Sequence, residues 1–309
     1  MGETLSEAND HFRALEHIDQ AFPIFERLTK RYPQVMDYRF DLATTYYDQG
    51  RALSRAGKVE EGLASRRKGV EGMEQLWKEY PNRNLIGSKA AMYRNGVVFN
   101  LLQLGRDKEA LDEGQKSIEV LRELVRRSPE SGEYRYNLGL SCMNASGVAV
   151  RLREHRKALE IARIGIQAIE QKALEIPSWN QTLAGLYDPY VAGAISQNLL
   201  DEAETTIRKA LAAREKLEPN AWTTFSTQSL LGEVLTAQKK FAEAELLLLK
   251  GYEGLKTQEK TLPAPGQVRM LLALDRLIAF YETLKKPDEV KRYKQLRAKY
   301  PDRSPFQPK

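Results

Sequence analysis

The sequence has 309 residues, 42% of them hydrophobic and 29% charged, a balance typical of a protein whose helices each bury one face. Lys and Arg outnumber Asp and Glu by 48 to 42, and the two signs are interspersed, so the formal charge of +6 does not favour nucleic-acid binding. Cys142 is the only cysteine, which excludes a disulfide framework and a Cys-based metal site. We therefore expect a cytoplasmic protein.

Proline recurs along the chain at a fixed interval. Pro33, Pro81, Pro129 and Pro177 are each separated by 48 residues, and each follows a stretch with helical periodicity. Because proline cannot continue a helix, these positions predict helix ends. A period of this length indicates a repeat protein.

In chain order, each predicted repeat unit consists of a first helix followed by a second helix. Residues 1–7 are expected to be disordered, and residues 8–31, ending at Pro33, match the second helix of a unit without a clear first helix. First helices are predicted at 36–56, 84–104, 132–153, 179–199, 221–239 and 267–285. Second helices are predicted at 59–79, 107–127, 155–175, 201–217, 241–260 and 288–299. One array would therefore cover 8–300, with a disordered tail at 301–309.

The second helices repeat two kinds of position. Apolar residues recur at the 48-residue interval, as at Leu63, Leu111 and Leu159, on one helical stripe. Small residues recur seven apart on a second register: Gly62 and Gly69, Ala110 and Ser117, Ala158 and Gly165, Ala203 and Ala210, Ala244 and Gly251. Glycine disfavours a helix by about 1 kcal/mol relative to alanine, so its recurrence there predicts close helix crossings.

This arrangement of paired helices, small residues and terminal proline resembles the tetratricopeptide repeat, whose standard unit has about 34 residues. The longer interval here indicates a lengthened variant. The resemblance implies an all-α fold, a right-handed superhelical solenoid of antiparallel helix pairs. Arg66 and Gly114 depart from it, because they occupy a register where the family keeps a large apolar residue.

A narrower similarity lies in two heptapeptides that are 96 residues apart, Asp37-Tyr-Arg-Phe-Asp-Leu-Ala43 and Glu133-Tyr-Arg-Tyr-Asn-Leu-Gly139. They resemble the repeat arrays that follow serine/threonine kinase domains in planctomycete-type bacteria. This chain contains no Gly-rich loop, catalytic Asp motif or Asp-Phe-Gly of a kinase. The similarity implies that any such kinase lies upstream or on another chain.

The sequence offers no recognisable catalytic or cofactor site. His11, His17 and His155 share no metal-ligand spacing, and no Walker-type, G-x-G-x-x-G or G-x-S-x-G motif occurs. No segment approaches the roughly 18 consecutive apolar residues of a membrane span. We therefore expect a protein that is not an enzyme, holds no cofactor or metal, and does not enter a membrane.

Stacked helix pairs generate a surface lined by first helices, where a partner would lie. Alignment with the family places three rows on this surface: Tyr47, Asn95 and Met143; then Arg51, Phe99 and Gly147; then Arg55, Gln103 and Arg151. Arginine pairs with carboxylates and aromatic rings supply buried area, so the rows suit an acidic and apolar peptide.

The leading hypothesis is a non-catalytic bacterial scaffold that holds a protein or peptide of unidentified sequence. One alternative is the regulatory or substrate-docking region of a serine/threonine kinase, with a role in signalling. A minor alternative is an RNA-binding helical array, whose affinity would fall steeply with salt. The sequence does not predict an oligomeric state.

Overall fold

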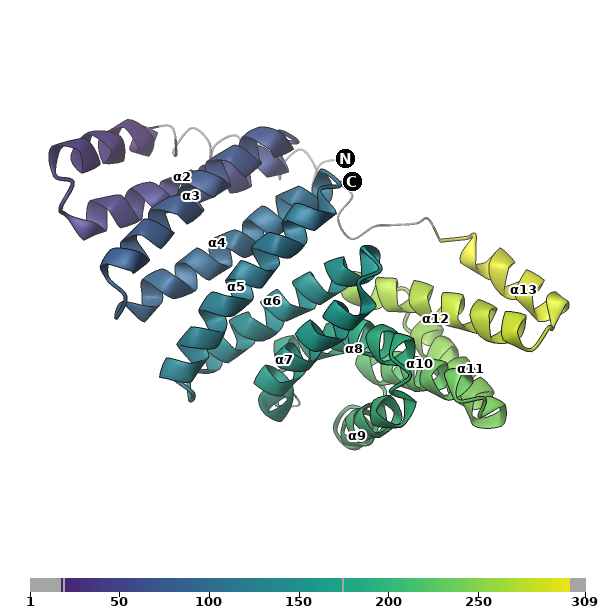
Figure 1. Cartoon of the computed structure of the whole chain (residues 1–309). Coiled ribbons are helices and arrows are strands. Elements are labelled where there is room, and N and C mark those ends of the chain that lie inside the picture. The colour runs from purple at the N-terminus through teal and green to yellow at the C-terminus, as the bar shows by residue number, and fades with distance from the viewer. Residues whose placement is uncertain (1–17, 19, 174, 301–309) are drawn as a thin grey trace. The chain divides into compact units, whose positions relative to one another are not determined.

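The computed structural model describes residue 18 and residues 20–173 and 175–300, and every regular element in these ranges is a helix (Figure 1). The first helices of the pairs are α2 (Met36–Arg55), α4 (Asn84–Gln103), α6 (Gly132–Arg151), α8 (Pro177–Ser196), α10 (Trp222–Ala237) and α12 (Ala264–Thr283). The second helices are α3 (Val59–Glu79), α5 (Asp107–Arg127), α7 (His155–Ala173), α9 (Leu200–Leu217), α11 (Phe241–Thr257) and α13 (Pro287–Arg297). Residues 20–31 are also helical.

The helix boundaries confirm the predicted all-α fold of antiparallel helix pairs, because each predicted end from α2 onward lies within about three residues of the observed one. Pro177 does more than end a helix, since it is also the first residue of α8. The missing N–H of proline costs nothing there, because that position has no partner within the helix. The predicted segments 1–7 and 301–309, and residues 8–17, lie outside the described residues.

The helices form two compact units, one ending at Val148 and the next beginning at Ala149, both within α6. A single array over 8–300 stays a prediction. In the first unit α4 packs against both α2 and α3 (Figure 1). In the second, α10 packs against α8 and α9, and α12 packs against α10 and α11. Each of these first helices thus lies in the groove of the preceding pair.

The turn between the two helices of a pair has one recurring backbone feature, a residue with positive φ. This residue is Gly57 (83°), Gly105 (69°), Arg153 (60°), Asn198 (56°), Lys239 (63°) and Lys285 (56°) in the six turns. Such a residue ends a helix by turning the chain back, and glycine adopts the conformation without steric cost. The shared geometry explains why each pair is antiparallel.

The predicted register of small residues lies at helix crossings where the backbones approach closely. A Cβ on Gly62 would lie 2.6 Å from the Gly50 carbonyl oxygen, and one on Gly69 would lie 2.8 Å from that of Ala43. In the second unit, a Cβ on Gly251 would lie 2.7 Å from the Phe225 carbonyl oxygen. Since these contacts are with backbone atoms, no rotamer change relieves them.

Candidate functional site

The first unit presents the predicted partner-binding rows on α2, α4 and the first part of α6. Tyr47 is half-buried, and its ring stacks on Tyr93 with centroids 3.9 Å apart and planes 6° from parallel. The Arg66 guanidinium lies 5.3 Å from the centre of the Tyr47 ring. Tyr47 therefore contributes to the packing between α2, α3 and α4, and its role in binding stays a prediction.

Three other predicted residues are also half-buried: Asn95, Gln103 and Met143. The Asn95 amide nitrogen donates a hydrogen bond to the Ser141 hydroxyl at 2.8 Å, which joins α4 to α6. The side-chain oxygens of Asn95 and Gln103 are buried and lack a hydrogen-bond partner among the described residues. These three side chains are therefore less accessible to a partner than the exposed side chains of the rows.

The residues that project most from the face are Arg51, Arg55 and Phe99. Arg51 pairs with Asp48 at 3.0 Å on the surface of α2, and Phe99 on α4 is 41% exposed. Met92, which the sequence analysis did not select, is 39% exposed and lies seven residues before Phe99 on the same side of α4. Two large apolar side chains on α4 and two arginines on α2 are therefore exposed to solvent in the first unit.

The two remaining row positions lie toward the end of α6. Arg151 is exposed at the last residue of α6, in the second unit. A Cβ built on Gly147 would meet no atom within 4 Å, so this part of α6 faces open space.

A buried polar network lies beneath the face of the first unit. Arg66, which is only 5% exposed, donates to the Gly96 carbonyl and, at 2.8 Å, to the Asn100 side-chain oxygen. The Asn100 amide donates in turn to the Ser54 hydroxyl at 2.8 Å. Burial lowers the pKa of Arg66, while these acceptors and the Tyr47 ring stabilise the cation. The Arg66 Nε lacks a hydrogen-bond partner among the described residues. An arginine thus replaces the apolar residue that the family resemblance implied at this position.

The second unit contains a similar network around Arg214 on α9. Its guanidinium donates to the Asn180 side-chain oxygen at 2.9 Å and to the Thr223 carbonyl at 3.2 Å, and it lies 5.4 Å from the centre of the Tyr187 ring. Burial lowers the pKa of Arg214 to about 10. Both units therefore use an arginine, an asparagine and a tyrosine to join helix pairs in the core.

A second charged group joins three first helices of the second unit. We term it the first-helix ion cluster, and it consists of Asp188 on α8, Glu233 on α10, and Arg269 and Arg276 on α12. Both arginines donate to Asp188, and Arg276 also donates to Glu233. Burial alone would lower the pKa of Arg276, but Glu233 and Asp188 outweigh it, so the pKa is raised. Two N–H groups, Arg269 Nε and Arg276 Nη1, lack an acceptor in the described part of the chain.

Sequence reasoning missed this cluster. Arg269 and Arg276 are seven residues apart and share a helix face, which is the one local signal. Their partner Asp188 is 81 and 88 residues away in the sequence, so no local spacing pairs them.

The lone cysteine has the character of a core residue. Cys142 is fully buried, and burial raises the pKa of its thiol.

Over residues 20–173 and 175–300, no three His, Cys, Asp or Glu side chains gather as metal ligands. None of the helices that the structure describes is long and apolar enough to cross a membrane.

The tetratricopeptide repeat family model matches residues 6–65. Among solved structures, BtubC (BKLC) from P. vanneervenii is similar with a TM-score of 0.55 and 15% identity, over 82% of this chain and 94% of that one. The fold is of tetratricopeptide type. The apo form of RapI is similar with the same TM-score and 11% identity, over 91% of this chain and 79% of that one. No curated protein sequence matches the chain.

Proposed function

We propose that this chain is a non-catalytic scaffold that holds a peptide or protein segment on the first-helix face of its first unit. The observation that carries the proposal is the exposure of Met92 and Phe99 on α4 together with that of Arg51 and Arg55 on α2. When a partner covers large apolar side chains that are exposed to water, the free energy of the system falls, which favours binding.

The chemistry of the face favours a segment with both acidic and apolar residues. Phe99 and Met92 supply apolar contact area, and methionine adapts to partners of different shape. Arg51 and Arg55 supply guanidinium groups that pair with carboxylates in a two-pronged geometry. The Arg66 and Asn100 side chains of the network under the face are buried and hydrogen-bonded to each other, so the recognition falls to these projecting side chains.

The test is the charge-reversal variant Arg51→Glu/Arg55→Glu, which changes the two exposed arginines of α2 that carry the proposal. Both arginines are exposed and contribute little to the core, so the variant is expected to fold like wild type and to lose a partner that wild type retains. Immobilised wild type and variant would be incubated with extract of the native organism, and the bound proteins identified by mass spectrometry.

The matched control is Arg126→Glu/Arg156→Glu, which makes the same charge change on the second helices α5 and α7. These side chains are 73% and 80% exposed. Retention of the partner by the control and its loss from the first variant would support the proposal. If the first variant retains every protein that wild type binds, the assignment of the face is wrong.

The kinase-linked and RNA-binding alternatives stay predictions from the sequence. An open reading frame for a kinase domain upstream of residue 1 would favour the first of them. RNA retention that weakens steeply as salt rises would favour the second, because counterions are released when basic side chains bind phosphates.

A further inference from the structure

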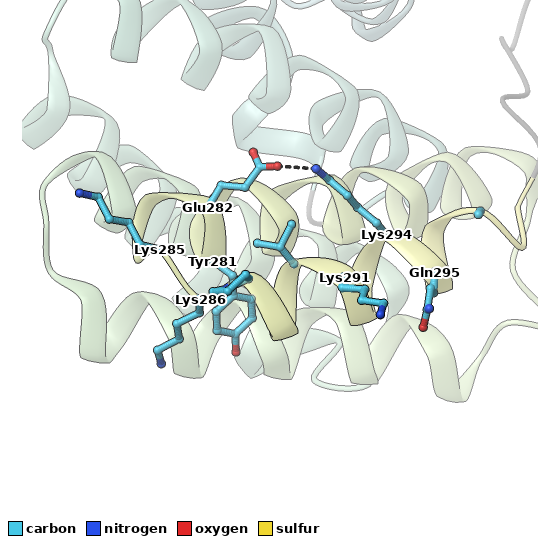
Figure 2. Close-up of a pocket in the computed structure, with 10 residues that line it drawn as sticks. Tyr281, Glu282, Lys285, Lys286, Lys291, Lys294 and Gln295 are labelled. Atoms are coloured by element: carbon cyan, nitrogen blue, oxygen red, sulfur yellow. Dashed lines mark hydrogen bonds and ion pairs between the residues drawn. The ribbon is translucent and has the colours of Figure 1, made fainter.

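An open groove of about 830 Å³ lies along the last helix pair, α12 and α13 (Figure 2). Its apolar lining comes from Tyr281, Pro287, Val290 and Ala298. Its rim carries four lysines, Lys285, Lys286, Lys291 and Lys294, together with Glu282 and Gln295. The groove thus combines apolar surface with charge of one predominant sign.

The position of this groove in the fold indicates what shape it accepts. In both units, the groove of an earlier helix pair receives the next first helix: α4 lies on α2 and α3, and α12 lies on α10 and α11. The pair of α12 and α13 ends the described residues, and none of their helices covers it. By the geometry of the fold, its natural occupant is a helix.

The lysines on the rim are only partly neutralised. Lys294 donates to Glu282 at 2.7 Å, and Figure 2 shows this bond across the groove. Lys286 lies 3.8 Å from Glu245 and 5.6 Å from the centre of the Tyr281 ring. Within the part of the chain that the structure describes, Lys285 and Lys291 have no carboxylate partner at ion-pair distance. An occupant with carboxylates along its flanks would therefore complete the rim.

A polar end face would by itself keep a repeat array from aggregating. A mixture of charges on a flat face would be enough for that purpose. The groove on α12 and α13 instead combines apolar lining from Pro287, Val290 and Ala298 with an excess of positive charge. These features are those of a binding surface with a defined partner chemistry.

We propose that the groove of α12 and α13 binds an acidic amphipathic helix of a partner protein. Its apolar stripe would cover Pro287, Val290 and Ala298, and its carboxylates would pair with Lys285, Lys291 and Lys294. The eleven residues of α13 extend over about 16 Å, so the occupant needs two to three helical turns. This surface is separate from the face proposed above.

The experiment titrates the full-length chain into a fluorescein-labelled peptide of about 14 residues, long enough for a helix of ~21 Å. The peptide carries Leu at i, i+3, i+4 and i+7 positions and Glu elsewhere, and binding is followed by fluorescence anisotropy. Saturable binding to wild type is expected. Lys291→Glu/Lys294→Glu is expected to weaken it by roughly tenfold or more, because both attraction and repulsion change.

The matched control is Lys216→Glu/Lys260→Glu, two exposed lysines outside the groove. It makes the same change in net charge and is expected to bind the peptide like wild type. Arg51→Glu/Arg55→Glu is expected to keep the peptide as well, which separates this proposal from the proposed function. A peptide with Ser in place of Leu is expected not to bind.

Three outcomes would overturn the proposal. One is the absence of saturable binding, and another is equal weakening in both lysine variants, which would indicate attraction by net charge alone. The third is self-association of wild type, measured by sedimentation velocity, that disappears in Lys291→Glu/Lys294→Glu. That result would make a second copy of the chain the occupant.

Discussion

Asp188→Asn is expected to lower the free energy of unfolding by about 3 kcal/mol, the cost of breaking a buried ion pair from one side. Asp188 accepts hydrogen bonds from both Arg269 and Arg276, whose side chains are only 14% and 9% exposed. In the variant, the amide side chain would present an NH₂ donor to the arginine N–H donors in place of one carboxylate oxygen, and two donors cannot form a hydrogen bond with each other. Arg276 keeps Glu233 as a partner, but Arg269 loses its carboxylate, and its Nε already lacks an acceptor among the described residues.

Thermal and urea unfolding would measure this effect. For a unit of this size, each kcal/mol shifts Tm by about 2–4 °C, so a fall of roughly 6–12 °C is expected. The control is Asp275→Asn, also on α12, whose carboxylate is 47% exposed and pairs with Arg297 at 2.9 Å. An exposed pair contributes less than about 1 kcal/mol, so its Tm should change little. Equal shifts in the two variants would contradict a special role for the first-helix ion cluster.

A second substitution distinguishes lost charge pairing from lost packing. Arg269→Met in the Asp188→Asn background removes the cation whose carboxylate partner the first change takes away, while Arg276 keeps its bond to Glu233. Part of the lost stability is therefore expected to return, with the two substitutions coupled. If the double variant is instead less stable than Asp188→Asn by the full effect of Arg269→Met alone, the residues are not coupled.

The sequence predicted the helices well because local signals mark their ends. The prolines at the 48-residue interval and the turns with a positive-φ residue, such as Gly57 and Gly105, fix where each helix begins and ends. The small-residue register was also readable, since close backbone crossings admit few side chains. Each of these features depends on residues near one another in the chain.

Burial depth and long-range pairing were harder to predict. The alignment placed Tyr47 and Phe99 in adjacent rows, but Tyr47 stacks on Tyr93 while Phe99 is open to solvent. The position of a residue in the repeat predicts the side of the helix on which it lies. How deeply its side chain is buried depends on the residues of the neighbouring helix. The ion pair between Asp188 and Arg276 could not be predicted, because the two residues are 88 positions apart. The repeat interval also shortens in the second unit, as in the 16 residues from Ala203 to Pro219. The rows of the first unit therefore do not extend to it.

Gly69→Leu is expected to destabilise the chain by about 1–3 kcal/mol, the usual cost of overpacking a close contact. A Cβ at this position would lie 2.8 Å from the Ala43 carbonyl oxygen and 3.1 Å from the Tyr47 backbone nitrogen. Since backbone atoms cannot rotate away, α3 must move from α2. Thermal unfolding checks the prediction, with Gly147→Leu as the control, because Gly147 faces open space in α6. That control should be neutral or stabilising by up to about 1 kcal/mol, as leucine favours a helix over glycine. An unchanged Tm for Gly69→Leu would mean that α2 and α3 do not cross closely at this register.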